Sequence, residues 1–243
     1  MQFHLPPLDR DPARGGADTI LERPRFGPDR GCRTFVQRVL RAGAGRSAER
    51  RGADDELLYV LDGAGALSVD GERFPVHAGN AVYVAAGTPW ASEVEDGGAL
   101  ELLSVVVCGA AGEEVPYAVL DLGAEDAQRA TAGREFRLGL TAETGCRAAT
   151  QFIGHIPPGR APDHFHRYDE VVYVLTGEGT LHIGGETAAL VAGACVHLPA
   201  RVVHSLENAG PDELLVLGVF RPAGSPAEAY YPDGTPALVP VET

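Results

Sequence analysis

The sequence contains no lysine. All 20 basic residues are arginines, set against 34 acidic residues, and the formal net charge is −14. Without a lysine amine, mechanisms that use a lysine Schiff base or a phosphate-loop lysine are excluded. A surface this acidic repels phosphate backbones and anionic lipid, so we expect neither nucleic acid nor a membrane as a partner.

Long apolar runs and secretion signals are also lacking. No run approaches the roughly 18–20 residues that a membrane-spanning helix needs. Residues 1–10 do not show a basic segment followed by an apolar stretch, which is the pattern of a signal peptide. The four cysteines form no CxxC pair and are expected to be reduced thiols. These features predict a cytoplasmic protein.

Helical patterns are sparse, and only residues 124–132 look modestly helical. A transcription regulator with a helix-turn-helix would need a helical stretch that this chain lacks. Glycine (31) and proline (18) are abundant, and hydrophobic residues come in short runs. This composition favours many short strands joined by tight turns.

An internal repeat organises the chain. Residues 56–90 align without a gap to residues 170–204 at an offset of 114, with Glu56 matching Glu170 and several glycines matching at expected turns. Glycine is favoured at turns because it accepts positive φ. We infer two copies of one β domain.

Alternating apolar and polar residues predict the strands of the second copy. We expect them at residues 148–155, 170–176, 179–183, 194–198, 203–208 and 214–220. Short strands at this spacing indicate an all-β sandwich or barrel.

Five segments follow from this pattern. They are an extended arm (1–30), a first β domain (31–112), a linker (113–140), a second β domain (141–222) and a proline-rich tail (223–243). The tail carries Tyr230 and Tyr231 and could fold back over a barrel mouth.

The strongest local signal is a group of possible metal ligands: His164, His166, Glu170 and His204. His164 and His166 are two residues apart, so on extended chain they point to one face, and Glu170 keeps the same parity. Taken singly, the histidine pair could be a polar strand face, Glu170 an exposed charge and His204 a turn residue. Jointly, inward imidazoles and a carboxylate need partners or a metal, which favours a mixed nitrogen and oxygen metal site.

These residues belong to two blocks that resemble the two motifs of the cupin superfamily. The first block contains Gly159, His164, His166, Glu170 and Gly177, and the second contains Gly193, Pro199, His204 and Asn208. The resemblance implies tandem jelly-roll β-barrels, a bicupin, with one divalent transition metal (Fe, Mn, Ni, Co, Cu or Zn) held by the three histidines and Glu170. Two departures are a spacing from Gly159 to His164 that is one residue short, and Arg201 where the motif has glycine.

The first copy lacks most of these ligands. Subtracting 114 gives Arg50, Gly52, Glu56 and Trp90, and neither a guanidinium, a glycine nor an indole replaces an imidazole ligand. We therefore expect a degenerate, metal-free first cupin whose role is packing, a dimer surface or a lid. An Arg50–Glu56 ion pair could occupy its interior.

The predicted activity is that of an enzyme. The resemblance implies a metal-dependent oxygenase, similar to cupin dioxygenases, that acts on a small organic substrate, and it also implies a homodimer or higher homo-oligomer. Tyr168 and Arg160 flank the ligands and are candidate catalytic residues, and Phe152 is a candidate substrate contact. Two alternatives stay open: a non-oxidative isomerase, hydrolase or lyase, such as a ureidoglycine aminohydrolase, and a small-molecule-binding cupin without turnover.

Overall fold

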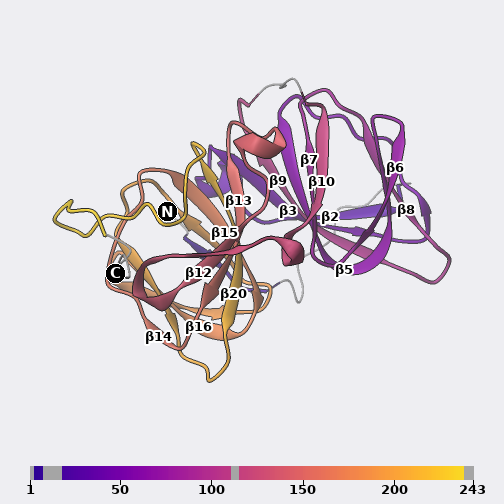
Figure 1. The fold of residues 1–243 in the computed structure, drawn as a ribbon. Helices are drawn as coiled ribbons and strands as arrows, with labels where there is room; N and C mark the ends of the chain where they lie inside the picture. The colour runs from indigo at the N-terminus through magenta and orange to yellow at the C-terminus, as the bar shows by residue number, and fades with distance from the viewer. Residues whose placement is uncertain (1–2, 8–17, 111–114, 238–243) are drawn as a thin grey trace. The chain divides into compact units, whose positions relative to one another are not determined.

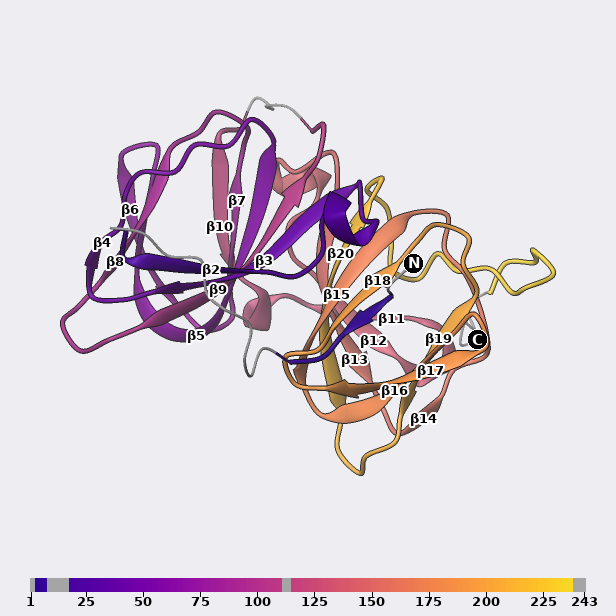
Figure 2. The ribbon, with the colours of Figure 1, turned by 180° about the vertical axis from the view of Figure 1, so that it is seen from behind.

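The structure, a computed structural model, describes residues 3–7, 18–110 and 115–237. The chain divides into two compact units (Figures 1 and 2). The N-terminal unit comprises Asp9–Ala124 and Gly139–Ala149, and the C-terminal unit comprises Met1–Leu8, Glu125–Leu138 and Thr150–Thr243. Each unit is built from strands and a few single-turn 3-10 helices, which confirms the all-β prediction.

The N-terminal unit is an antiparallel sheet in the order β10-β7-β5-β9-β3-β2. Strand β5 changes register between Val60 and Asp62, and its later part pairs with β6 and β8. One strand thus serves two sheet layers, which curls the unit. The elements are β2 (Ile20–Pro24), η1 (Pro28–Arg30), β3 (Phe35–Ala42), β4 (Gly45–Arg46), β5 (Asp55–Val69), β6 (Glu72–His77), β7 (Asn80–Val84), β8 (Trp90–Val94), β9 (Leu100–Val107), β10 (Tyr117–Asp121), η2 (Leu122–Ala124) and η4 (Ala142–Thr144).

The C-terminal unit has two antiparallel sheets, ordered β1-β18-β15-β20-β13-β12-β11 and β14-β19-β16-β17. Its first strand comes from the start of the chain and pairs with β18 (Figure 2). The elements are β1 (His4–Leu5), β11 (Ala127–Arg129), η3 (Thr131–Gly133), β12 (Glu135–Leu138), β13 (Thr150–Ile156), β14 (Gly159–Arg160), β15 (Asp169–Thr176), β16 (Glu178–Ile183), β17 (Glu186–Val191), β18 (Cys195–Leu198), β19 (His204–Asn208) and β20 (Leu214–Arg221). The six strands predicted for the second copy correspond to β13, β15, β16, β18, β19 and β20, and β17 was not anticipated.

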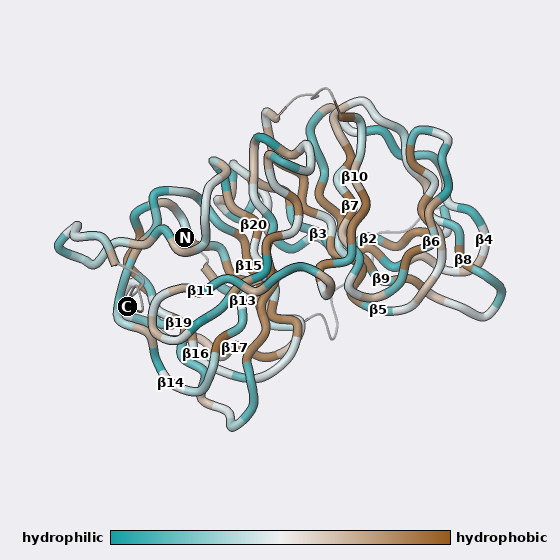
Figure 3. The backbone as a smooth tube through the Cα atoms, viewed as in Figure 1, coloured by the Kyte–Doolittle hydropathy of each residue, from teal (hydrophilic) through white to brown (hydrophobic). Residues whose placement is uncertain are grey.

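Each unit has its own hydrophobic core. In the C-terminal unit Val172 and Val216 from one sheet pack with Leu181 and Leu206 from the other. Figure 3 shows hydrophobic residues along the strands and hydrophilic residues in many of the connecting loops. Among the described residues, no helix has the length and apolar character needed to cross a membrane.

The two units repeat the same irregularities. The register shift of β5 between Val60 and Asp62 recurs in β15 between Val174 and Thr176, each 114 residues later. Gly63 and its counterpart Gly177 follow these shifts with φ of 84° and 86°. A Cβ on either one would collide with backbone across the sheet, so both positions require glycine. Irregularities shared at a constant offset support the inferred repeat.

Three segments differ from the sequence prediction. The expected arm over residues 1–30 contains β2, which pairs with β3 and buries Ile20 in the core of the N-terminal unit. The expected linker over residues 113–140 supplies β10 to one sheet and β12 to another. Residues 124–132, expected as a helix, instead contain β11 and parts of two 3-10 turns. The five sequence-based boundaries stay a proposal about how the chain could be divided.

Candidate metal centre

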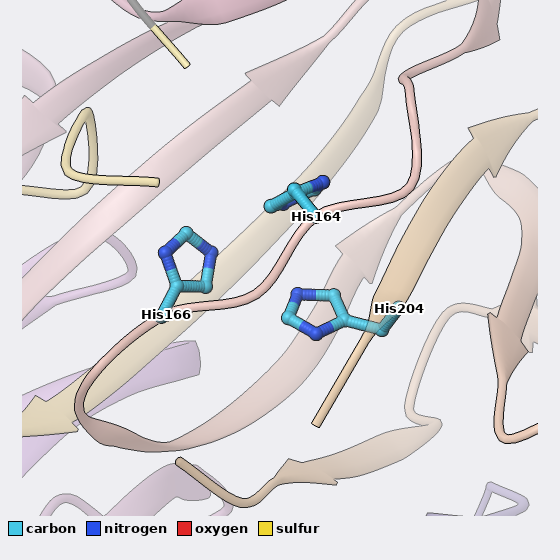
Figure 4. A group of neighbouring side chains, drawn as sticks. All are labelled: His164, His166 and His204. Atoms are coloured by element: carbon cyan, nitrogen blue, oxygen red, sulfur yellow. The ribbon is translucent and has the colours of Figure 1, made fainter. Parts of the chain in front are cut away.

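Two adjoining segments of the C-terminal unit carry the three histidines. His164 and His166 lie on the stretch just before β15, and His204 is the first residue of β19. The backbones of His164 and His204 exchange two hydrogen bonds, at 3.0 and 2.8 Å. Figure 4 shows the imidazoles of His164 and His166 on one segment and that of His204 on the neighbouring strand, around a common space.

The three imidazoles are close to one another. Their ring centroids are 4.7 to 5.3 Å apart, and one nitrogen from each ring can be chosen so that all lie within 4.8 Å of one another. Nitrogens that share one ion at about 2.1 Å lie at most about 4.2 Å apart. Small side-chain rotations would therefore bring the three nitrogens onto one ion.

Each imidazole has its Nδ1 held by a backbone carbonyl. Nδ1 of His164 donates to the oxygen of Pro162 at 2.8 Å, that of His166 to Glu228 at 2.8 Å, and that of His204 to Val202 at 2.9 Å. Since a carbonyl can only accept, these bonds place the proton on Nδ1 and leave the Nε2 lone pair available. The same arrangement orients metal-bound histidines in proteins.

The electrostatics keep the three imidazoles neutral. Burial is the first cause of a lowered pKa at each ring, to about 3 for His166 and well below the ordinary value for His204. Mutual repulsion with His164 lowers the pKa of His166 and His204 further. A neutral imidazole is the form that coordinates a metal, so the rings are ready to bind a cation.

Glu170 lies on β15 and lines the same cavity as the histidines, with only 5% of its surface exposed. It does not belong to the group of ligand atoms within 4.8 Å, which consists of the three histidines. Burial raises its pKa to about 8. A nearby cation would favour the ionised form, so Glu170 is suited to be a fourth ligand once a metal is bound.

The cavity around these side chains measures about 80 Å³. Its walls combine apolar side chains, among them Phe136, Phe152, Val172 and Leu206, with the histidines and other polar residues. Apolar walls with convergent polar groups are the usual form of a small-molecule site.

Of the other residues singled out from the sequence, two line this cavity and one lies outside it. Phe152 lines the cavity and packs against Phe220 with centroids 5.7 Å apart. Tyr168 also lines it, stacked between His166 at 4.7 Å and Phe220 at 4.0 Å. Arg160 is on the opposite side, where it donates to Ser205 and Asp163, and it is not one of the described cavity-lining residues.

The sequence analysis missed two contributions to the site. Arg134, in the expected linker, lines the cavity. The tail supplies the carbonyl of Glu228 and wall residues Pro226 and Ala229, and Tyr230 exchanges backbone hydrogen bonds with Phe165. A single arginine and a backbone carbonyl belong to no sequence motif that could be recognised. The only indication in the sequence was the pair of tyrosines in the tail, which suggested that the tail folds back over the barrel.

The N-terminal unit fills the corresponding interior with an ion network. Arg50 and Trp90 form the backbone bridge that matches His164 and His204. Glu56 is 6% exposed and accepts hydrogen bonds from Trp90 Nε1 at 3.0 Å, Arg38 at 2.9 Å and Ser104.

The predicted Arg50–Glu56 pair is wrong. Arg50 instead pairs with Asp18 at 3.0 Å and Glu22 at 2.5 Å. Asp18 and Glu22 lie in the segment expected as an arm, which is why the sequence pattern offered Arg50 no partner other than Glu56. Within the described residues, the only group of possible metal ligands is that of the C-terminal unit.

Comparison with known proteins agrees with this architecture. The cupin-domain family model matches residues 38–106 and 152–220, and both pairs of limits differ by 114. Quercetin 2,3-dioxygenase of Bacillus subtilis is 24% identical, over 72% of this chain and 72% of its own. Among solved structures, protein Ylba from E. coli has a TM-score of 0.75 at 13% identity, covering 90% of this chain and 89% of that chain. A deletion mutant of Bacillus subtilis oxalate decarboxylase has a TM-score of 0.73 at 14% identity, covering 91% and 77%. These two likenesses show the fold alone.

Proposed function

The chain belongs to the cupin family, with two cupin domains in tandem, and on that premise we propose that its C-terminal barrel is the centre of a metal-dependent oxygenase. The substrate would be a small organic molecule bound beside one divalent transition metal. The metal ligands would be His164, His166, His204 and Glu170.

One observation carries the metal site: three imidazoles each have Nδ1 fixed by a carbonyl and leave Nε2 available around a common space. Imidazoles held through Nδ1 by a carbonyl, with Nε2 directed at a shared space, have the arrangement of metal-bound histidines. A divalent metal with four protein ligands retains open coordination positions and supplies Lewis acidity and redox capacity.

The chain's own residues would bind and orient the substrate. Phe136 and Phe152 form apolar wall that keeps bulk water from the reacting groups. Tyr168 lines the cavity, and burial raises the pKa of its hydroxyl well above the ordinary value. It therefore keeps its proton and can donate a hydrogen bond to a substrate oxygen.

Oxygenase chemistry is supported by the relative that is named a quercetin 2,3-dioxygenase and covers 72% of this chain. In an oxygen-electrode assay with enolic and catecholic compounds, we expect O₂ uptake that matches substrate loss. Turnover without O₂ uptake would overturn the oxygenase assignment and point to an isomerase, hydrolase or lyase. Binding without turnover would point to a small-molecule-binding cupin.

Elemental analysis tests the metal site independently of any substrate. We expect about one divalent metal per purified wild-type chain and a loss of at least about tenfold in metal affinity for His166→Ala. His182→Ala is the matched control, because this imidazole lies on β16 and binds Glu207 at 2.7 Å. Equal metal content in all three proteins, or two metals per chain, would contradict the proposed site.

A further inference from the structure

Arg134 places a positive charge in the wall of the cavity. It follows η3 and immediately precedes β12, and it lines the cavity together with the three histidines and Glu170. One amino group of its guanidinium donates to the backbone oxygen of Leu206 at 2.5 Å. This bond fixes the guanidinium against β19, the strand that carries His204.

The charge of Arg134 is not neutralised by the protein. No carboxylate among the described residues forms an ion pair with it. Glu135 is next in the chain and also lines the cavity, but it is exposed and forms no ion pair with Arg134. Burial lowers the pKa of Arg134 to about 10, so the side chain is still a cation at neutral pH. Arg134 is half-buried, and holding a cation there without an anion is unfavourable, which points to an anion that arrives from outside.

The N-terminal unit holds a different residue at this position. Subtracting 114 from Arg134 gives Ile20, and the sheets agree: Ile20 pairs with Ala42 as the first residue of β2, the strand that corresponds to β12. Ile20 is 2% exposed and belongs to the hydrophobic core. A cation thus stands in the C-terminal unit where the other copy has a buried isoleucine.

In the N-terminal unit, by contrast, two arginines of the corresponding interior have carboxylate partners. Arg38 contacts Glu22 and Glu56, and Arg50 contacts Glu22 and Asp18. At the positions of Glu22 and Arg38 the C-terminal unit has Phe136 and Phe152. The C-terminal cavity therefore has two aromatic side chains where the N-terminal unit has an ion pair, and it has one additional cation, Arg134.

We propose that Arg134 binds the carboxylate or enolate oxygen of the substrate, so that the C-terminal barrel acts on small organic anions. The remaining donors of the guanidinium fit two oxygens in one plane, as a carboxylate presents them. Phe136 and Phe152 would contact the apolar part of the same molecule. The proposal rests on the proposed function, because it assigns a substrate class to that cavity.

Binding of simple acids and their amides tests this assignment. Isothermal titration calorimetry would compare benzoate with benzamide, and propionate with propionamide, on the full chain loaded with Zn²⁺ and on the metal-free chain. We expect wild type to bind each acid at least about tenfold more tightly than its amide. Arg134→Met, which keeps an unbranched side chain and removes the charge, should abolish that difference.

Two further variants complete the test. Arg134→Lys keeps the charge but loses the planar fork, so it should restore only part of the preference for acids. Arg129→Met is the matched control, because Arg129 is an exposed arginine on β11 that lies opposite Glu135. It should bind acids as wild type does.

The outcomes separate this proposal from the metal site. The role of Arg134 would be overturned if the wild-type protein bound acid and amide equally well or bound neither. It would also be overturned if the Arg134→Met variant still preferred the acid. Zn²⁺ content is measured on the same samples. A chain that binds Zn²⁺ and fails these tests retains its metal site and loses only the anionic substrate, whereas a chain that binds acids but no metal contradicts the proposed enzyme.

Discussion

Gly218 lies directly against the ring of Phe152. A Cβ at Gly218 would stand 2.2 Å from Cε1 of Phe152 and 2.9 Å from Oε1 of Glu170. The N-terminal unit has Ser104 and Arg38 at these two positions, and there both side chains donate to Glu56. One small residue therefore gives the C-terminal cavity its aromatic wall and leaves the carboxyl of Glu170 accessible.

Gly218→Ala should destabilise the protein by about 1–3 kcal/mol, because the added methyl forces the Phe152 ring out of its place. Urea denaturation at constant pH measures the change. Gly27→Ala is the control, since nothing lies within 4 Å of its built Cβ and its φ of 178° is open to any residue. Equal free energies of unfolding for the two variants would mean that Phe152 does not pack as described.

Arg38→Met should destabilise the N-terminal unit by roughly 2–3 kcal/mol, because it leaves the nearly buried Glu56 without its cation. Adding Glu56→Gln to this variant should recover part of the loss. A double-mutant cycle of unfolding free energies measures the coupling. Metal content should stay at wild-type level in all members of the cycle, and a drop in any member would argue against a metal-free first barrel.

Glu170→Gln should stabilise the metal-free protein, and increasingly so at higher pH. Glu170 has a folded-state pKa of about 8, above its ordinary value of 4.5. The unfolded chain therefore releases this proton first, and the wild type loses stability as pH rises from about 4.5 to 8. The variant avoids that loss, which reaches on the order of 3 kcal/mol near neutral pH.

Denaturation of chelator-treated wild type and variant at acidic and at neutral pH checks this sign. With metal present the order should reverse, because the amide is a weaker ligand than a carboxylate. A difference between the two proteins that does not change with pH would show that the carboxyl group titrates normally.

Ending the chain after Pro222 should lower metal affinity by about 10–100-fold, because it removes the carbonyl of Glu228 that holds Nδ1 of His166. Ending it after Ala237 retains that carbonyl and the backbone bond from Ala237 to Ala229, and serves as the control. Metal titration of both proteins measures the effect. Equal affinities would mean that the tail does not orient the ligand.

Local spacing was sufficient to single out the histidines of the candidate site. His164 and His166 are two residues apart, and His204 was expected on a neighbouring antiparallel strand, where the structure bridges its backbone to that of His164. Strand patterns succeeded because side chains alternate between core and solvent. The cupin architecture followed from these same residues, and the family match confirms it.

The missed parts depend on contacts that are distant in sequence. Residues 127–129 contain alanine, glutamine and arginine, all good helix formers, yet they form β11 because they pair with β12. Arg134 lies at the cavity because the same hairpin of β11 and β12 positions it there. Likewise, Arg50 forms its hydrogen bonds with Asp18 and Glu22, about 30 residues upstream. Pairing energy across a sheet exceeds intrinsic propensity, and no local pattern encodes it.

Strand β1 joins the first residues of the chain to the edge of β18, through His4 and Leu5 and a further bond from His197 to the oxygen of Phe3. A C-terminal half expressed alone would expose that edge of β18, with unpaired backbone groups ready to recruit a strand from another molecule. The barrel that carries the histidines is thus completed by a strand from residues 4–5, so a fusion, tag or deletion next to these residues acts on that barrel.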